Sequence, residues 1–270
     1  MRLTVNGIRY HVETSGAGEP LLLLHGFTGS MATWEPFVAA WSRRMRVIRI
    51  DLLGHGETDS PADFARYAVE HAAADLANVL DRLHVRQTHL LGYSMGGRLA
   101  LAFALMYPER VKTLVLESSS PGIASLAERQ NRIAHDGALA DRIEKEGVAA
   151  FTDHWESLPL FASQSRLPAA VREQIRAGRL KNNPRGLANS LRGMGAGAQP
   201  SYWQNLPQLS LPVLILAGEL DAKYCAIGQK VKNMLPQAQL RIVPDAGHTV
   251  HVEQSEIFAT IVMKFLQGRN

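Results

Sequence analysis

The sequence predicts an α/β fold in which helices cover both faces of a mostly parallel β-sheet. Three observations indicate this fold. Short apolar runs alternate with longer amphipathic stretches, residues 2–14 alternate polar and apolar side chains around Asn6-Gly7, and the strand-and-helix pattern is interrupted once, between residues 120 and 210. Buried strands that alternate with amphipathic helices are typical of a parallel sheet with a helical layer on each face.

Each element follows from one of these patterns. Asn-Gly between alternating side chains favours a type I′ hairpin, so two antiparallel strands are expected to lead the sheet. The amphipathic stretches 70–84 and 95–107 predict helices that pack against it. Short apolar runs, each a candidate buried strand, occupy residues 21–25, 46–51, 88–92, 112–117, 212–217 and 239–243.

Residues 120–210 predict an inserted helical cap, because helical segments and Gly-rich or Pro-rich breaks replace strands there. The strand pattern then resumes at residue 212. Residues 1–119 and 211–270 are therefore expected to form one discontinuous core domain. A ligand site is expected where the cap meets this core.

Composition excludes several classes of protein. Of 270 residues, 46% are hydrophobic and 20% charged, which permits a buried core and argues against disorder. The net charge is only +4 without continuous basic runs, so no nucleic-acid partner is expected. The uncharged stretch 20–34 is too polar to span a bilayer, so no membrane partner is expected. Residues 1–16 lack a signal-like apolar run and Cys225 is the single cysteine, which predicts a cytoplasmic location.

A serine stands at a predicted strand-to-helix turn. Gly92-Tyr93-Ser94-Met95-Gly96 follows the strand 88–92 and precedes the helix 95–107, which is the required context of a nucleophile elbow. The flanking glycines allow close backbone approach, and the helix N-terminus favours negative charge nearby. The alternative is a glycine-rich turn with an incidental serine. The strand and helix around it favour a nucleophile at Ser94.

A serine nucleophile needs a base that an acid orients, and on this architecture the three follow in the order Ser, Asp, His. Asp221 follows the strand 212–217, and His248 follows the strand 239–243, so both are expected at strand ends. Other candidates stay open at this point. Asp245 or Glu219 could supply the acid, and His25 or His55 the base.

Two main-chain N–H groups are candidates for an oxyanion hole. Met95 follows the serine, and Phe27 follows the strand 21–25 in His25-Gly26-Phe27. Phe27 could equally form a pocket wall. No metal site is predicted, since His248 and His251 lack further ligands nearby. We expect His251 to pack or hydrogen-bond at the start of the last helix.

The motifs HGF, DLLGHGETD, GYSMGG, GELD and DAGH together resemble the α/β-hydrolase superfamily over nearly the whole chain. GYSMGGRLAL, AERQNR, FTDHWESLPLFASQ, RLKNN and GAQPSYW narrow the resemblance to the 2-succinyl-6-hydroxy-2,4-cyclohexadiene-1-carboxylate (SHCHC) synthases of menaquinone biosynthesis. The resemblance implies an α/β-hydrolase fold and a lyase that eliminates pyruvate without a cofactor. Tyr224 departs mildly from the pattern, because the family more often has Phe after Lys223.

The implied substrate is a small polyanion. The resemblance places Arg98, Arg129 and Arg179 at carboxylate-binding positions, with Tyr93 and Trp155 lining the pocket. Charge supports this expectation independently, since residues 157–210 contain seven basic residues and one acidic residue, a balance of +6. Guanidinium groups suit carboxylates because both can form two parallel hydrogen bonds. The arginines could instead be solvated surface charges, and Arg132 and Arg176 are close enough in sequence to confuse the assignment.

Two other functions stay open on sequence grounds. The same serine site could hydrolyse esters or carbon–carbon bonds, with Ser94 or an activated water attacking a carbonyl. The fold could also serve as a ligand receptor that signals through its cap. No motif specifies an oligomeric state.

Overall fold

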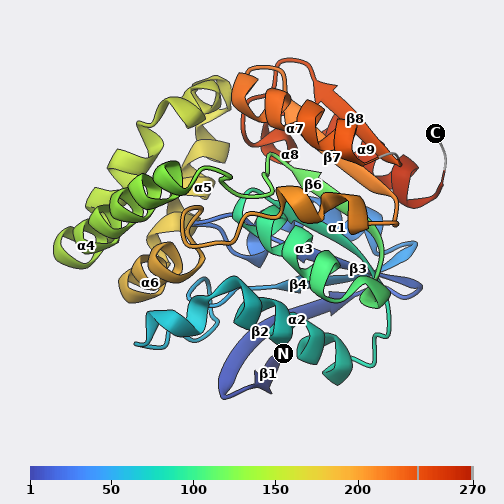
Figure 1. Cartoon of the computed structure of the whole chain (residues 1–270), viewed down its shortest axis with the longest axis horizontal. Helices are drawn as coiled ribbons and strands as arrows, with labels where there is room; N and C mark the ends of the chain where they lie inside the picture. The colour runs from blue at the N-terminus through green and yellow to red at the C-terminus, as the bar shows by residue number, and fades with distance from the viewer. Residues whose placement is uncertain (236, 269–270) are drawn as a thin grey trace.

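The computed structural model describes residues 1–235 and 237–268, and within them eight strands form one sheet in the order β1-β2-β4-β3-β5-β6-β7-β8 (Figure 1). From β4 to β8 in this order every neighbouring pair is parallel, whereas β1 and β2 are antiparallel. The strands are β1 (Arg2–Val5), β2 (Ile8–Ser15), β3 (Glu19–Leu24), β4 (Met45–Ile50), β5 (Thr88–Tyr93), β6 (Val111–Glu117), β7 (Val213–Gly218) and β8 (Ala238–Val243).

The predicted hairpin is confirmed. β1 and β2 pair with Val5 opposite Ile8, and the two residues between them both have positive φ, 48° at Asn6 and 79° at Gly7. Positive φ at both central residues defines the type I′ turn, whose twist matches that of the flanking strands. All six predicted buried strands are also present, each within two residues of its expected bounds.

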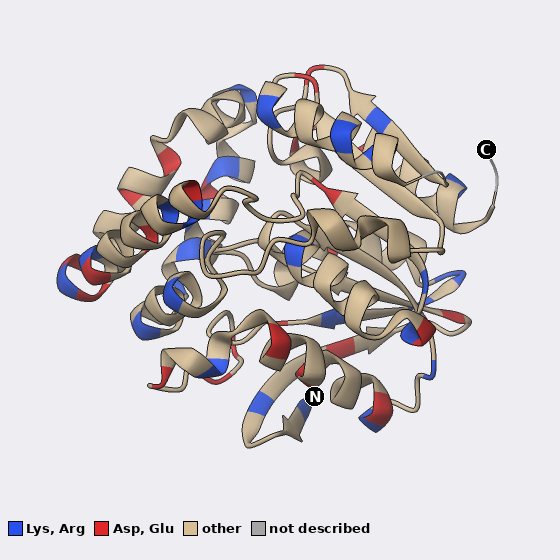
Figure 2. Cartoon of the chain, in the orientation of Figure 1, with Lys and Arg blue, Asp and Glu red and all other residues tan. Residues whose placement is uncertain are grey.

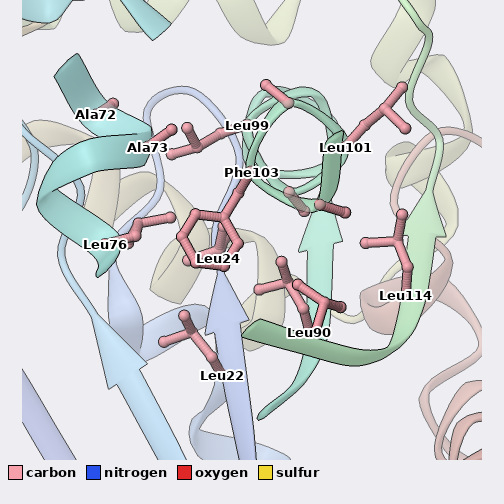
Figure 3. Packing of buried hydrophobic residues seen from close by; sticks show 14 of the residues in the cluster. Leu22, Leu24, Ala72, Ala73, Leu76, Leu90, Leu99, Leu101, Phe103 and Leu114 are labelled. Carbon is pink, nitrogen blue, oxygen red and sulfur yellow. The ribbon is translucent and has the colours of Figure 1, made fainter. Parts of the chain in front are cut away.

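Helices cover both faces of the sheet, because the buried strands carry apolar side chains on both sides. On one face, Leu22, Leu24 and Leu90 pack against α2 and α3 (Figure 3). On the other face, Leu21 and Leu23 pack with residues of α1 and α9. The helices outside residues 120–210 are α1 (Glu35–Trp41), α2 (Val69–Arg82), α3 (Met95–Met106), α7 (Ala222–Met234), α8 (Val250–Glu253) and α9 (Ser255–Leu266), with 3-10 helices η1 (Met31–Trp34), η2 (Phe64–Tyr67) and η3 (Pro108–Arg110).

Residues 120–210, all of which the structure describes, form only helices and loops between β6 and β7. We call them the helical segment 120–210. They include α4 (Leu126–Glu156), η4 (Pro159–Arg166), α5 (Ala169–Leu180), α6 (Pro184–Met194) and η5 (Trp203–Gln208). α4 and α6 share a small apolar cluster that includes Ile143, Phe151 and Leu187. Figure 1 shows α4, α5 and α6 grouped together on one side of the sheet.

Candidate active site

Ser94 lies in a strained turn between β5 and α3. Its φ of 50° and ψ of −108° are unusual for a residue with a side chain, and strain of this kind concentrates at functional sites. Ser94 N donates a hydrogen bond to Glu117 O at 2.8 Å, which ties the turn to the end of β6. A Cβ at Gly96 would lie 2.5 Å from both Leu24 O and His25 O, so only glycine fits there.

Ser94, His248 and Asp221 form one chain of hydrogen bonds, although 154 residues separate the serine from the histidine. Ser94 Oγ lies 3.0 Å from His248 Nε2, and His248 Nδ1 lies 2.7 Å from Asp221 Oδ2. The carboxylate can only accept, so Nδ1 carries the proton and Nε2 is left to accept one from the serine. Asp221 is fixed in turn because it also accepts a hydrogen bond from Tyr224 N at the start of α7. This geometry suits a serine activated by a base.

The alternative acids and bases lie elsewhere. Glu219 and Asp245 are exposed, and within residues 1–235 and 237–268 neither forms a hydrogen bond or ion pair with a histidine. His25 and His55 are buried beside each other, with ring centroids 5.2 Å apart. Burial lowers the pKa of His25 to about 4 and that of His55 to about 3, so both are neutral at pH 7. Leu52 N donates to His25 Nε2, which fixes the His25 proton on Nδ1, where it is donated to Gly26 O.

The two oxyanion-hole candidates occupy a strand end and a helix start. Met95 is the first residue of α3, where N–H groups have no intrahelical acceptor. Phe27 lies after β3 in a tight turn that Gly29 N closes by donating to Gly26 O at 3.0 Å. The Phe27 ring also packs against Trp155 of α4, with centroids 5.3 Å apart. Phe27 therefore belongs to both a donor loop and an aromatic wall.

His251 forms a second buried pair, with Glu117. Its ring Nδ1 lies 2.8 Å from Glu117 Oε1, and its main-chain N donates to the same oxygen at 3.0 Å. The expected hydrogen bond at the start of the last helices is therefore present. Sequence reasoning missed Glu117 as its partner. The available signal was a carboxylate at the end of an otherwise apolar strand.

Arg98 is buried one helical turn after Ser94 and has no acidic partner among the described residues. It is 9% exposed, and its Nη1 donates to two neutral oxygens, Met194 O at 3.0 Å and Gln199 Oε1 at 2.7 Å. Burial lowers the pKa of this guanidinium to about 10, so it stays charged at pH 7. Its electrostatic neighbours include Tyr224, whose ring lies 4.8 Å from that of His248. A buried cation thus lies close to the Ser94 site without an ion-pair partner among the described residues, although the charge of Asp136 acts on it and raises its pKa.

The arginines of α4 have different surroundings. Arg129 is half-buried, and its Nε donates to Gly197 O at 3.3 Å. Arg132 forms an ion pair with Asp136 at 2.8 Å, and its charge lowers the pKa of Arg98. Arg132 therefore lies close enough to Arg98 for its charge to act on that guanidinium.

Arg179 of α5 is buried and already has an acidic partner, Glu156, at 2.8 Å. Its guanidinium also lies over the Phe161 ring, 5.3 Å from the centroid. Carboxylates on α4 similarly neutralise Arg176 and Arg192 of the basic stretch 157–210. Figure 2 shows acidic and basic residues mixed on α4, facing the basic residues of α5 and α6. The local excess of +6 is therefore smaller in three dimensions than along the sequence.

A cavity of about 310 Å³ lies beside the serine site and opens between the sheet and α5. Phe27, Tyr93, Phe161 and Arg179 line it, whereas Ser94 does not. The buried Tyr93 ring borders the cavity and also packs against His248 and His251, with ring centroids 5.6 and 4.7 Å away. Burial and the Glu117 charge raise the pKa of Tyr93, so its hydroxyl is protonated at pH 7.

Neither metal ligands nor a membrane span accompany these residues in the part of the chain that the structure describes. Within residues 1–235 and 237–268, no three His, Cys, Asp or Glu side chains gather as a metal site would require. Over the same residues, every helix is too short or too polar to cross a bilayer. Cys225 Sγ is 3.2 Å from Gly218 O, and burial raises its pKa.

Comparison with known proteins gives consistent results. The sequence model of the alpha/beta hydrolase fold family matches residues 19–255. A Bacillus subtilis protein described as a candidate 2-succinyl-6-hydroxy-2,4-cyclohexadiene-1-carboxylate synthase is 51% identical over 98% of both chains. The synthase of that name from Serratia proteamaculans is 32% identical, over 91% of this chain and 92% of its own. The solved structure of MenH from S. aureus superposes with a TM-score of 0.92 at 36% identity, covering 96% of this chain and 98% of that one.

Proposed function

The chain belongs to the SHCHC synthase family within the alpha/beta hydrolases, and we propose that it eliminates pyruvate from 2-succinyl-5-enolpyruvyl-6-hydroxy-3-cyclohexene-1-carboxylate. The product is 2-succinyl-6-hydroxy-2,4-cyclohexadiene-1-carboxylate, an intermediate of menaquinone biosynthesis. Long, nearly complete similarity to proteins of this name supports the reaction class. The site residues supply the mechanism.

The reaction is a 1,4-elimination across the ring. A base removes the proton from ring carbon 2, which the neighbouring succinyl ketone acidifies. The electron pair forms the C2–C3 double bond, the C3–C4 double bond moves to C4–C5, and the C5–O bond breaks. Enolpyruvate leaves and becomes pyruvate when its methylene carbon gains a proton. No water is added and no electrons are exchanged with a cofactor.

Ser94 is the proposed base. Its hydroxyl donates to His248 Nε2, so the oxygen gains alkoxide character as the imidazole takes the proton. Asp221 holds the imidazole in the required tautomer and stabilises the positive charge that develops on it. The N–H groups of Phe27 and Met95 are the proposed donors to the succinyl oxygen, which gains negative charge as the proton leaves.

The burial of Arg98 without an ion-pair partner among the described residues is the observation that supports a polyanionic substrate. Burying a charge is costly unless an opposite charge compensates it. Among the described residues no carboxylate forms an ion pair with Arg98, and Asp136, whose charge acts on Arg98, is itself paired with Arg132. A substrate carboxylate beside Ser94 would supply the missing charge. Arg179 is a further candidate, although Glu156 would have to share it or yield.

Pyruvate release from the enolpyruvyl substrate tests this proposal, coupled to lactate dehydrogenase and followed together with absorbance of the new conjugated diene. The wild type should release one pyruvate for each diene formed. Ser94→Ala, His248→Ala and Asp221→Asn should each lose at least about 10³-fold in kcat, because the three act as a unit. His251→Gln, outside the hydrogen-bonded chain, is the comparison variant. A wild type without pyruvate release would refute the proposal.

Acyl transfer is a second candidate, because the Ser94 hydrogen bond to His248 would equally suit attack on an ester carbonyl. A chromogenic ester distinguishes the two. A burst of one leaving group per protein followed by steady hydrolysis would favour a hydrolase, whereas the elimination proposed above needs no acyl-enzyme.

A further inference from the structure

Asn182, in the connection between α5 and α6, joins three segments through its buried side-chain amide. Nδ2 donates to Thr28 O at 2.8 Å and to Arg179 O at 3.1 Å, while Oδ1 accepts from Gly56 N at 3.2 Å. The residue is 5% exposed. Two carbonyl acceptors and one N–H donor admit a single orientation of the amide. Asn182 belongs to the RLKNN motif, for which the mechanism above gives no role.

The Thr28 carbonyl that Asn182 binds lies in the turn that carries the Phe27 N–H. Thr28 has a φ of 66°, a left-handed conformation that β-branched residues rarely adopt, so its surroundings must hold it there. Gly29 N closes the same turn by donating to Gly26 O. Any shift of Thr28 therefore moves the Phe27 N–H.

The sheet side of this turn has its own supports. His25 Nδ1 donates to Gly26 O at 2.8 Å, and a Cβ at Gly26 would lie 2.5 Å from Tyr93 Cε1. The turn is thus packed against the Tyr93 ring on the side that faces the sheet. Asn182 supplies the corresponding contact from the helical segment 120–210.

We propose that Asn182 is a positioning residue, which holds the 26–29 turn so that the Phe27 N–H points at the oxygen where negative charge develops. The inference rests on the role given to Phe27 in the proposed function. Because Asn182 belongs to the helical segment, the oxyanion donor is complete only when that segment is seated on the turn.

Asn189 of α6 provides a matched control. Asn189 is also buried, at 3% exposure, and its Nδ2 donates to two carbonyls of the connection between β4 and η2, Pro61 O and Ala62 O, both at 3.0 Å. It therefore docks the same helical segment by the same kind of bond. The loop that it binds carries none of the proposed reacting groups.

The experiment compares Asn182→Ala with Asn189→Ala in steady-state pyruvate release and in thermal melting. A displaced oxyanion donor should lower kcat of Asn182→Ala by about 10-fold or more, with KM changed by no more than about 2-fold. Asn189→Ala should keep kcat within about 2-fold of the wild-type value, while its melting temperature falls by about as much as that of Asn182→Ala. Unchanged kcat in Asn182→Ala, or equal losses in both variants, would overturn the proposal.

Asn182→Asp separates the hydrogen bond that the Asn182 side chain accepts from the two that it donates. It keeps the acceptor for Gly56 N but places a carboxylate oxygen against the Thr28 and Arg179 carbonyls, so it should be at least as slow as Asn182→Ala. Recovery of wild-type kcat in Asn182→Asp would show that the Gly56 bond matters and would overturn the proposal.

A fluorophosphonate probe makes the test independent of the substrate. Ser94 Oγ displaces fluoride from phosphorus, the serine proton passes to His248, and the phosphoryl oxygen uses the oxyanion donors. If the wild type releases no pyruvate, the proposed function fails while the labelling rate still decides this inference. Slower labelling of Asn182→Ala than of Asn189→Ala supports it, and equal rates overturn it.

Discussion

At Arg98, a full positive charge is held beside Ser94 by two neutral oxygens, one from the end of α6 and one from Gln199. These bonds also connect α3 to the helical segment 120–210. Arg98 therefore has a structural role in addition to the binding role that the sequence suggested. Its replacement should lower stability as well as activity.

Arg98→Ala should lower kcat/KM by about 10- to 100-fold, the equivalent of about 1.5 to 3 kcal/mol for a charged hydrogen bond. Loss of the donor to Met194 O and Gln199 Oε1 should reduce the free energy of unfolding by about 1 to 3 kcal/mol. Arg98→Lys should recover part of the activity, because an ammonium keeps the charge without the planar fork. Steady-state kinetics and urea unfolding measure the two effects.

Arg192→Ala is the control for this prediction. Arg192 lies on α6 in exposed ion pairs with Asp141 and Glu144, which contribute at most about 1 kcal/mol. We expect its kcat/KM to stay near the wild-type value. Unchanged kcat/KM in Arg98→Ala would contradict a carboxylate bound at that position.

Residues in a fixed local context were predictable, and residues defined by long-range contacts were not. Ser94, Asp221 and His248 each follow an apolar strand, so topology brings them to one edge. Asn182 carries no such mark, and Glu117 ends an apolar strand but has nothing near it in sequence that indicates its partner. Both roles depend on segments more than 100 residues away. For the same reason the sequence could not choose between Arg129 and Arg132 on α4.

At the level of elements, the loop after β3 depends on a neutral His25, and the loop after β4 contains the buried His55. Burial lowers their pKa values from 6.5 to about 4 and about 3. The unfolded chain binds protons on these rings below pH 6.5, whereas the folded chain does so only near pH 4 and 3. Stability present above pH 6.5 is therefore lost as the pH falls through this window.

Each of the two histidines should lower the free energy of unfolding by about 1.4 kcal/mol per pH unit between pH 6 and 4.5. Urea unfolding at several pH values measures this slope. His55→Gln should have a shallower slope than the wild type, whereas His71→Gln, at an exposed position of α2, should leave it unchanged. Identical slopes for both variants would show that His55 is not held neutral by the fold.

The strands were predictable because each is a short apolar run that ends at a polar or glycine residue, and the hairpin because Asn-Gly specifies its turn. The helical segment was harder to divide. α4 continues from Leu126 to Glu156 through a non-helical Gly147, with a φ of 81°, and composition does not indicate where such a long helix is interrupted.

Across the whole molecule, one edge of the sheet collects the serine, histidine and aspartate, and Gln199 and Met194 of the helical segment bind Arg98 one helical turn from the serine. The charge balance of +6 counted along residues 157–210 overestimated the positive charge of that part of the structure, because α4 supplies the carboxylates that pair with Arg176, Arg179 and Arg192. Arg98 is a buried cation that forms no ion pair with a carboxylate among the described residues. A buried positive charge and the Ser94–His248 hydrogen bond therefore lie within one helical turn of each other along α3.

Proton removal by this site is tested most directly with the enolpyruvyl substrate carrying deuterium at ring carbon 2. Pyruvate release is measured for labelled and unlabelled substrate with the wild type, and acid-quenched reactions are assayed for succinate. Removal of the C2 proton by Ser94 predicts a primary isotope effect on kcat/KM, equal amounts of pyruvate and diene, and no succinate. Release of succinate in place of pyruvate would instead show that water or Ser94 attacks the succinyl ketone, and would contradict the proposed elimination.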